Sequence, residues 1–105
     1  MDEIKFLKGV WLKSDGMSGR LVVNIKRAET MFAVTDVKRV CARKVTWGKE
    51  KKAGLVVTCK GRLNWGDEND FYFVTDTVDY VAKALNRPEE ELSALILQKE
   101  LEEDK

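Results

Sequence analysis

Apolar and polar residues alternate through most of the first three quarters of the chain. Because successive side chains of a β-strand point to opposite faces, each alternating set predicts one face of a half-buried strand. The early sets are Ile4 and Phe6, Val10 and Leu12, Leu21, Val23 and Ile25, and Phe32 and Val34. Later strands are expected over residues 39–47, 55–60 and 71–74, with a short one at Leu63 and Trp65. Roughly five to seven short strands in a row, with little room for helices between them, favour antiparallel pairing.

Two segments between these strands are rich in turn-forming residues. Residues 14–19 contain Ser, Asp and Gly and are expected to connect the first two strands. Residues 48–53 are expected to form a hairpin turn, and a turn centred near Glu50 places Cys41 opposite Cys59. Opposed thiols make a redox switch if they are exposed and meet disulfide geometry; otherwise they pack as small buried hydrophobes.

The hydrophobic period changes to about 3.6 after Thr75, which predicts a helix. The apolar residues at helical spacing are Val78, Val81, Ala82 and Leu85. Asp76 is suited to the N-cap of this helix and Asn86 to its end. Pro88 suits the first position of a second helix, and the three glutamates that follow it favour the positive end of the helix dipole.

The pattern therefore predicts an α+β fold that is mostly β. We expect a bent antiparallel sheet or small barrel, followed by one or two C-terminal helices. Residues 1–86 would form the β domain with its closing helix, and residues 87–105 an acidic C-terminal helix or tail. At 105 residues the chain is long enough to form a core without disulfides or metal.

Charge divides along the same boundary as the hydrophobic period. Residues 1 to 60 hold fourteen basic and six acidic residues, a balance of +8, whereas residues 61 to 105 hold five basic and twelve acidic residues, a balance of −7. The sequence thus predicts a basic sheet followed by acidic helices.

The residue inventory does not favour catalysis or metal binding. The chain has no histidine, the commonest general base, and neither of its two cysteines has a histidine partner. Two cysteines without histidine do not make a four-ligand zinc site within one chain. We therefore expect a binding protein rather than an enzyme, with no cofactor.

A basic cluster is predicted around the later hairpin. Its members are Lys38, Arg39, Arg43 and Lys44 on one strand, and Trp47, Lys49, Lys51 and Lys52 near the tip. If they converge, they form a positive patch for the phosphates of nucleic acid or anionic lipid, with Trp47 stacking on a base or entering the membrane interface. The alternative is a solvated outer face whose charges protect the sheet from edge pairing.

The second helix has apolar residues on two sides. Leu92, Leu95 and Ile96 share one face, and Ala94, Leu97 and Leu101 fall roughly opposite. One face can pack on the sheet. The other face, with Leu97 and Leu101, is then a candidate interface with another protein or with a second copy of the chain. The alternative is a frayed end that simply exposes Leu101.

The start of the chain, Met1-Asp2-Glu3, is acidic where a secretory signal would be positive, and apolar runs are short. We therefore expect a cytoplasmic protein without integral membrane association.

The order of these elements resembles the pleckstrin-homology-like superfold, in particular its small bacterial and GRAM-type domains. The resemblance covers most of residues 4 to 86, and its nearest local match is the segment Gly54-Leu55-Val56-Val57-Thr58-Cys59-Lys60, then the strand from Phe71 to Val74 and the helix through Leu85. It implies a binding module, and many members of that superfold bind protein.

Lipid-binding members of the superfold hold phosphoinositide headgroups with spaced basic residues around the loop between the first two strands. Lys13 and Arg20 match this pattern here, whereas Val22 stands where a second basic residue is expected. Tyr80 is the nearest aromatic residue to the tryptophan of the closing helix in eukaryotic members. The sequence thus favours protein–protein interaction as the function. Nucleic-acid binding through a small basic β-barrel and anionic-lipid binding are the alternatives.

Overall fold

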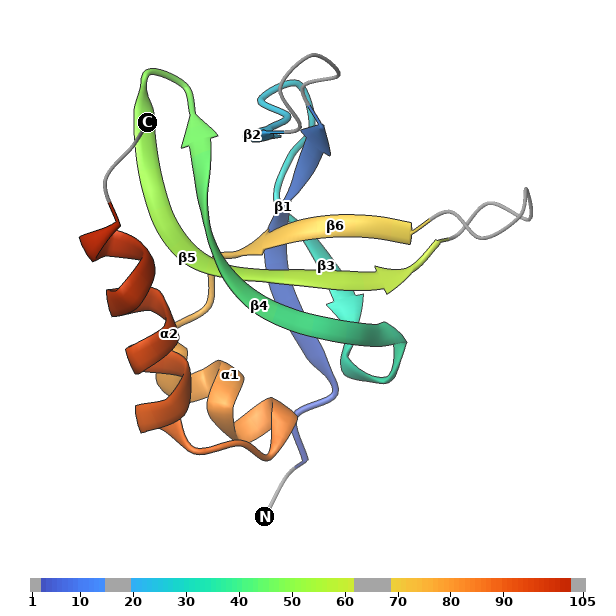
Figure 1. Cartoon of the computed structure of the whole chain (residues 1–105). Helices are drawn as coiled ribbons and strands as arrows, with labels where there is room; N and C mark the ends of the chain where they lie inside the picture. The colour runs from blue at the N-terminus through green and yellow to red at the C-terminus, as the bar shows by residue number, and fades with distance from the viewer. Residues whose placement is uncertain (1–2, 15–19, 62–68, 103–105) are drawn as a thin grey trace.

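A computed structural model describes residues 3–14, 20–61 and 69–102 (Figure 1). Six strands, one short 3-10 helix and two C-terminal helices follow one another in the described residues. They are β1 (Phe6–Ser14), β2 (Leu21–Val23), β3 (Thr30–Ala33), η1 (Val34–Asp36), β4 (Val37–Trp47), β5 (Glu50–Lys60), β6 (Asn69–Val74), α1 (Val78–Leu85) and α2 (Glu89–Leu101). The predicted α+β class, mostly β with C-terminal helices, is confirmed. The predicted turn after Ser14 and the predicted strand at Leu63 and Trp65 lie outside the described residues.

The strands close into a ring. β4, β5 and β6 pair in sequence, β6 pairs with the middle of β1, the last residues of β1 pair with β2, and β2 returns to β4. The first residues of β1 pair with β3, which lies at the outer edge of the sheet. The pairings are antiparallel except for β2 with β4, which is parallel at Val22 and Thr46. This pairing joins strands far apart in sequence, so the local alternation pattern did not predict it.

The two faces of the sheet carry separate cores. On β5, Leu55, Val57 and Cys59 face α1 and α2, where they pack with Val81 and Leu92. Val56 points to the opposite face, into the interior of the ring with Phe73 of β6, and that core also contains Val10, Leu12, Leu21, Val23 and Val45. Residues 54–57 of β5 are therefore buried on both faces, which explains why this strand has a continuous apolar run.

The predicted buried face at the start of β1 was wrong. Leu7 is fully buried, whereas Phe6 is 50% exposed. β1 buries apolar side chains on both of its faces, since Leu7 faces the helices and Val10 faces the ring interior. Ile25 likewise lies outside the strands and is exposed, and Val34 belongs to η1 rather than to β3.

The predicted pairing of the two cysteines was also wrong. The β4–β5 turn is formed by Gly48 and Lys49, since Trp47 pairs with Glu50, and Gly48 has the positive φ of 65° that such a tight turn favours. The turn therefore lies before Glu50, and Cys41 stands opposite Val56. The structure thus offers no support for a redox pair of Cys41 and Cys59, and neither cysteine forms a disulfide.

The helices begin and end close to the predicted positions. The N-cap of α1 is Thr77, whose Oγ1 accepts from the Tyr80 N–H at 3.3 Å, and not the predicted Asp76. Asp76 instead accepts a hydrogen bond from the Lys8 N–H of β1 at 2.7 Å. Asn86 ends α1 in the left-handed conformation, as predicted. Pro88 was expected to be the first residue of α2 but is its N-cap, so the helix begins one residue later, at Glu89.

Candidate interaction surfaces

The eight residues of the predicted basic cluster lie along the whole β4–β5 hairpin. Lys38 and Trp47 are nine positions apart on β4, roughly 30 Å at the rise of an extended strand. Near the start of β4, Lys38 Nζ donates to Asn69 Oδ1 at 3.0 Å. Lys44 Nζ, further along, donates to the carbonyl of Glu102 just past α2. The cluster thus divides into a tip group, Lys49, Lys51 and Lys52, and a strand group, Lys38, Arg39, Arg43 and Lys44.

Trp47 packs against the core in the ring interior. Its indole is half-buried and meets the Phe73 ring edge-on, with 5.8 Å between centroids. Lys52 Nζ lies 4.9 Å from the Trp47 ring centroid as a cation–π contact, and Lys52 also lies 3.9 Å from a carboxylate oxygen of Glu50. A stacking platform needs an open ring face, and these neighbours restrict access to the indole.

Trp11 has a similar environment on the other face of the sheet. It is half-buried, its ring centroid lies 4.6 Å from that of Tyr72, and the Arg27 guanidinium stands 3.9 Å from its centroid. Trp65 lies outside the described residues. The two described tryptophans therefore help to hold the sheet together through ring packing and cation–π contacts.

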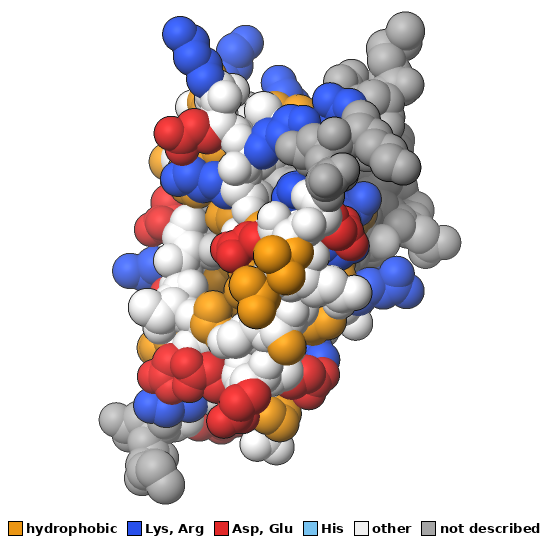
Figure 2. All heavy atoms as spheres, turned by 60° about the vertical axis from the view of Figure 1, so that its left-hand side comes forward, with side chains coloured by type: hydrophobic (Ala, Val, Ile, Leu, Met, Phe, Trp, Pro, Cys, Tyr) orange, Lys and Arg blue, Asp and Glu red, His pale blue; other side chains and the backbone are white. Residues whose placement is uncertain are grey.

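The outer face of α2 is an exposed apolar strip made of Ala94, Leu97 and Leu101, as the helical spacing predicted. Leu97 is 54% exposed and Leu101 is 75% exposed, whereas Leu92 on the opposite side is fully buried. The helix extends through Leu101, so both exposed leucines lie within α2. Figure 2, which brings the α2 side forward, shows hydrophobic side chains between acidic ones.

A groove runs between α2 and β4. It has a volume of about 440 Å³ and is lined by Arg39, Cys41, Ala42, Arg43, Leu95, Gln98 and Lys99. Two of its lining residues, Cys41 and Ala42, are small, and its charged lining residues, Arg39, Arg43 and Lys99, are all basic. This groove contains two members of the strand group of cations, Arg39 and Arg43, and adds Lys99 from α2.

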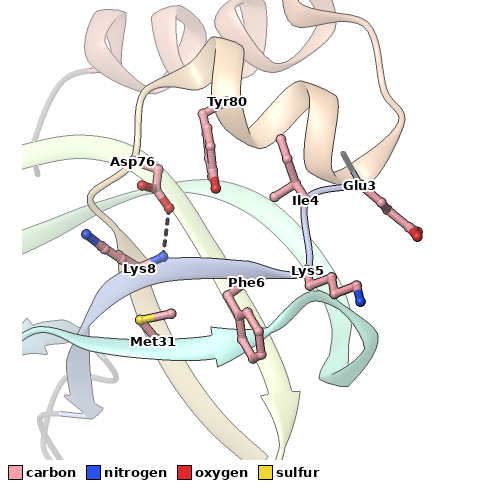
Figure 3. Close-up of a pocket in the computed structure, with 8 residues that line it drawn as sticks. All are labelled: Glu3, Ile4, Lys5, Phe6, Lys8, Met31, Asp76 and Tyr80. Atoms are coloured by element: carbon pink, nitrogen blue, oxygen red, sulfur yellow. Dashed lines mark hydrogen bonds between the residues drawn. The ribbon is translucent and has the colours of Figure 1, made fainter. Parts of the chain in front are cut away.

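A hollow lies between the start of β1, β3 and α1 (Figure 3). Phe6 is 50% exposed, Met31 51% and Tyr80 40%, and these three side chains line a volume of about 430 Å³. Asp76 lies at its rim, held by the Lys8 N–H (Figure 3). Sequence reasoning missed this hollow because it placed Phe6 in the core. The only available signal was that Leu7, its immediate neighbour, is also a large apolar residue.

Among residues 3–14, 20–61 and 69–102, no three His, Cys, Asp or Glu side chains gather as a metal-binding group. Within the same residues, neither helix has the length and apolar character that a membrane crossing requires.

Comparison with protein-family models, curated proteins and solved structures finds no match to this chain. The resemblance to the pleckstrin-homology-like superfold therefore stays a prediction.

Proposed function

We propose that this chain is a non-catalytic protein-interaction module that self-associates through α2. The observation that carries the proposal is the exposed apolar strip of Ala94, Leu97 and Leu101 on a helix whose other side is already buried in the core. Scattered exposed apolar residues are ordinary, but a strip on one helix face is typical of a contact surface.

The charges around the strip favour a second copy as the partner. The first turn of α2 is acidic, with Glu89, Glu90 and Glu91. The other end of the helix lies against the basic hairpin, because Lys44 donates to the carbonyl of Glu102 (Figure 1). If two copies of α2 pair antiparallel about a two-fold axis, the acidic turn of each helix approaches the basic hairpin of the other copy.

Sedimentation equilibrium tests this proposal directly. At about 100 μM, the wild-type chain should be a dimer, because even a modest interface has a micromolar dissociation constant. The double variant Leu97→Asp with Leu101→Asp should be a folded monomer, because it places charges in the centre of the contact. A monomeric wild-type chain at this concentration would overturn self-association.

A matched control separates the strip from exposed apolar residues in general. Ile25 is 74% exposed, close to the value of Leu101, but lies in the turn after β2. Ile25→Asp should leave the dimer intact. Equal weakening of the dimer by Ile25→Asp would show that α2 is not the contact.

A further inference from the structure

Among the residues that the structure describes, no strand lies beside the outer edge of β4 over most of its length. β4 pairs with β5 from Val37 to Trp47, and on its other side the only pairing recorded in the described part of the chain joins Thr46 to Val22. In a strand, every second residue directs its N–H and C=O groups toward a given edge. Residues 39–43, which include the β4 residues that line the groove, therefore present backbone donors and acceptors along the groove between β4 and α2.

We propose that this groove binds an extended acidic segment of another protein, which adds to β4 as a further strand. Strand addition uses the backbone of the edge for affinity and the neighbouring side chains for specificity. The site lies on a different flank of α2 from the strip of Ala94, Leu97 and Leu101, so it goes beyond the proposed self-association.

The side chains of the groove define the pattern of the segment. Arg39, Cys41 and Arg43 alternate on one face of β4, since they stand opposite Thr58, Val56 and Gly54 in an unbroken register. An added strand would place side chains beside these three at every second position. Two carboxylates four residues apart, roughly 13 Å along a strand, match the two arginines, and a small residue between them matches Cys41.

The other face of the added strand would meet α2. There the groove is lined by Leu95, with Gln98 and Lys99 above Ala42. Intervening residues of the segment should therefore be apolar. Together the two faces specify a segment in which glutamates flank alternating apolar residues, such as Glu-Leu-Ala-Leu-Glu.

The edge favours a peptide over a nucleic acid. Backbone N–H and C=O groups in a row are matched by another extended backbone, whereas phosphate groups need donors alone. The β4 residues between the two arginines that line the groove, Cys41 and Ala42, are small, and none of the lining residues is aromatic. Base stacking therefore has no platform in the groove.

The experiment uses a fluorescein-labelled peptide, GELALEG, and fluorescence anisotropy with the wild-type chain. The permuted peptide GEELALG, with the same composition, puts its glutamates on opposite faces and should bind at least ~tenfold more weakly. N-methylation of single peptide amides should abolish binding at alternate positions only, because half of the amides face β4. Equal affinity for the two peptides, or an N-methyl scan without alternation, would overturn strand addition.

Variants of the protein supply the second arm. Arg39→Glu with Arg43→Glu should weaken GELALEG binding by at least ~tenfold, because both carboxylates lose their partners. Lys26→Glu with Lys60→Glu makes the same change in net charge on exposed residues outside the groove and outside the hairpin tip, and should leave binding within about twofold.

Two readouts keep this site separate from self-association and from nucleic-acid binding. The Leu97→Asp, Leu101→Asp chain should bind GELALEG as the wild type does, so loss of the dimer and loss of the groove are distinguishable. If single-stranded DNA displaces the peptide at physiological salt with higher affinity, the groove is a phosphate site and the proposal fails. If GELALEG does not bind, the cations only protect the edge of β4 from aggregation.

Discussion

Phe73 occupies the space that a side chain at Gly54 would need. A Cβ placed on Gly54 would lie 2.5 Å from Cζ of the Phe73 ring, well inside van der Waals contact. Phe73 is buried in the ring interior and also meets Trp47 edge-on, so it has little freedom to move away. Gly54 therefore sets how closely this aromatic ring approaches β5.

Gly54→Ala should destabilise the chain by about 1–3 kcal/mol, the usual cost of overpacking a core. Thermal or urea denaturation measures the change. In a Phe73→Leu background the ring is gone, so the added cost of Gly54→Ala should fall substantially in a double-mutant cycle. An unchanged cost there would mean that the methyl group does not clash with Phe73.

The conformation and burial of a residue were predictable from the sequence where its neighbours along the chain decide its environment. Asn86 adopts the left-handed conformation expected of a helix terminator, and Leu92 is buried as its helical face implied. Phe6 and Trp47 were not predictable. Their exposure depends on β3 and β6, which meet them through pairings distant in sequence.

At the level of the elements, the turn before α1 has two polar residues with separate tasks. Thr77 caps the helix, whereas Asp76 accepts from the Lys8 N–H, beyond the point where β6 has ended. Asp76 thus satisfies a backbone donor on the edge of β1. Both residues have the chemistry of an N-cap, so sequence alone does not assign the roles.

Thr77→Ala should cost about 1 kcal/mol of stability, because the Tyr80 N–H loses its acceptor. Thr77→Ser keeps the hydroxyl and should restore most of that stability, which chemical denaturation can measure. If Thr77→Ser were as unstable as Thr77→Ala, the methyl group rather than the cap would be the stabilising part.

The β4–β5 hairpin was also predictable only in part from the sequence. Its existence and its two strands were predictable from alternation, but the register depends on which residue takes the positive φ of the turn. Gly48 does so, which moves the pairing by enough to separate Cys41 from Cys59. A shift in the turn changes every cross-strand neighbour, so the cysteine pairing failed although the strands were right.

At the level of the whole molecule, the division of charge along the sequence is also a division in space. The acidic first turn of α2 and the basic hairpin lie at opposite ends of the same helix, because Lys44 contacts the carbonyl of Glu102. A single copy therefore keeps these charges apart along α2. An antiparallel pair of copies brings each acidic end to the other copy's basic end.

This arrangement predicts how the dimer responds to charge reversal. Glu89→Lys with Glu90→Lys should weaken self-association, because like charges then meet at both ends of the helix pair. Adding Lys49→Glu with Lys51→Glu in the same chain should restore it by reversing the hairpin as well. Sedimentation equilibrium at low and moderate salt measures both, and screening should reduce the difference between the variants. If the hairpin changes fail to rescue the dimer, the two helices do not pair antiparallel. The strip of Ala94, Leu97 and Leu101 would then have to meet its partner in another orientation.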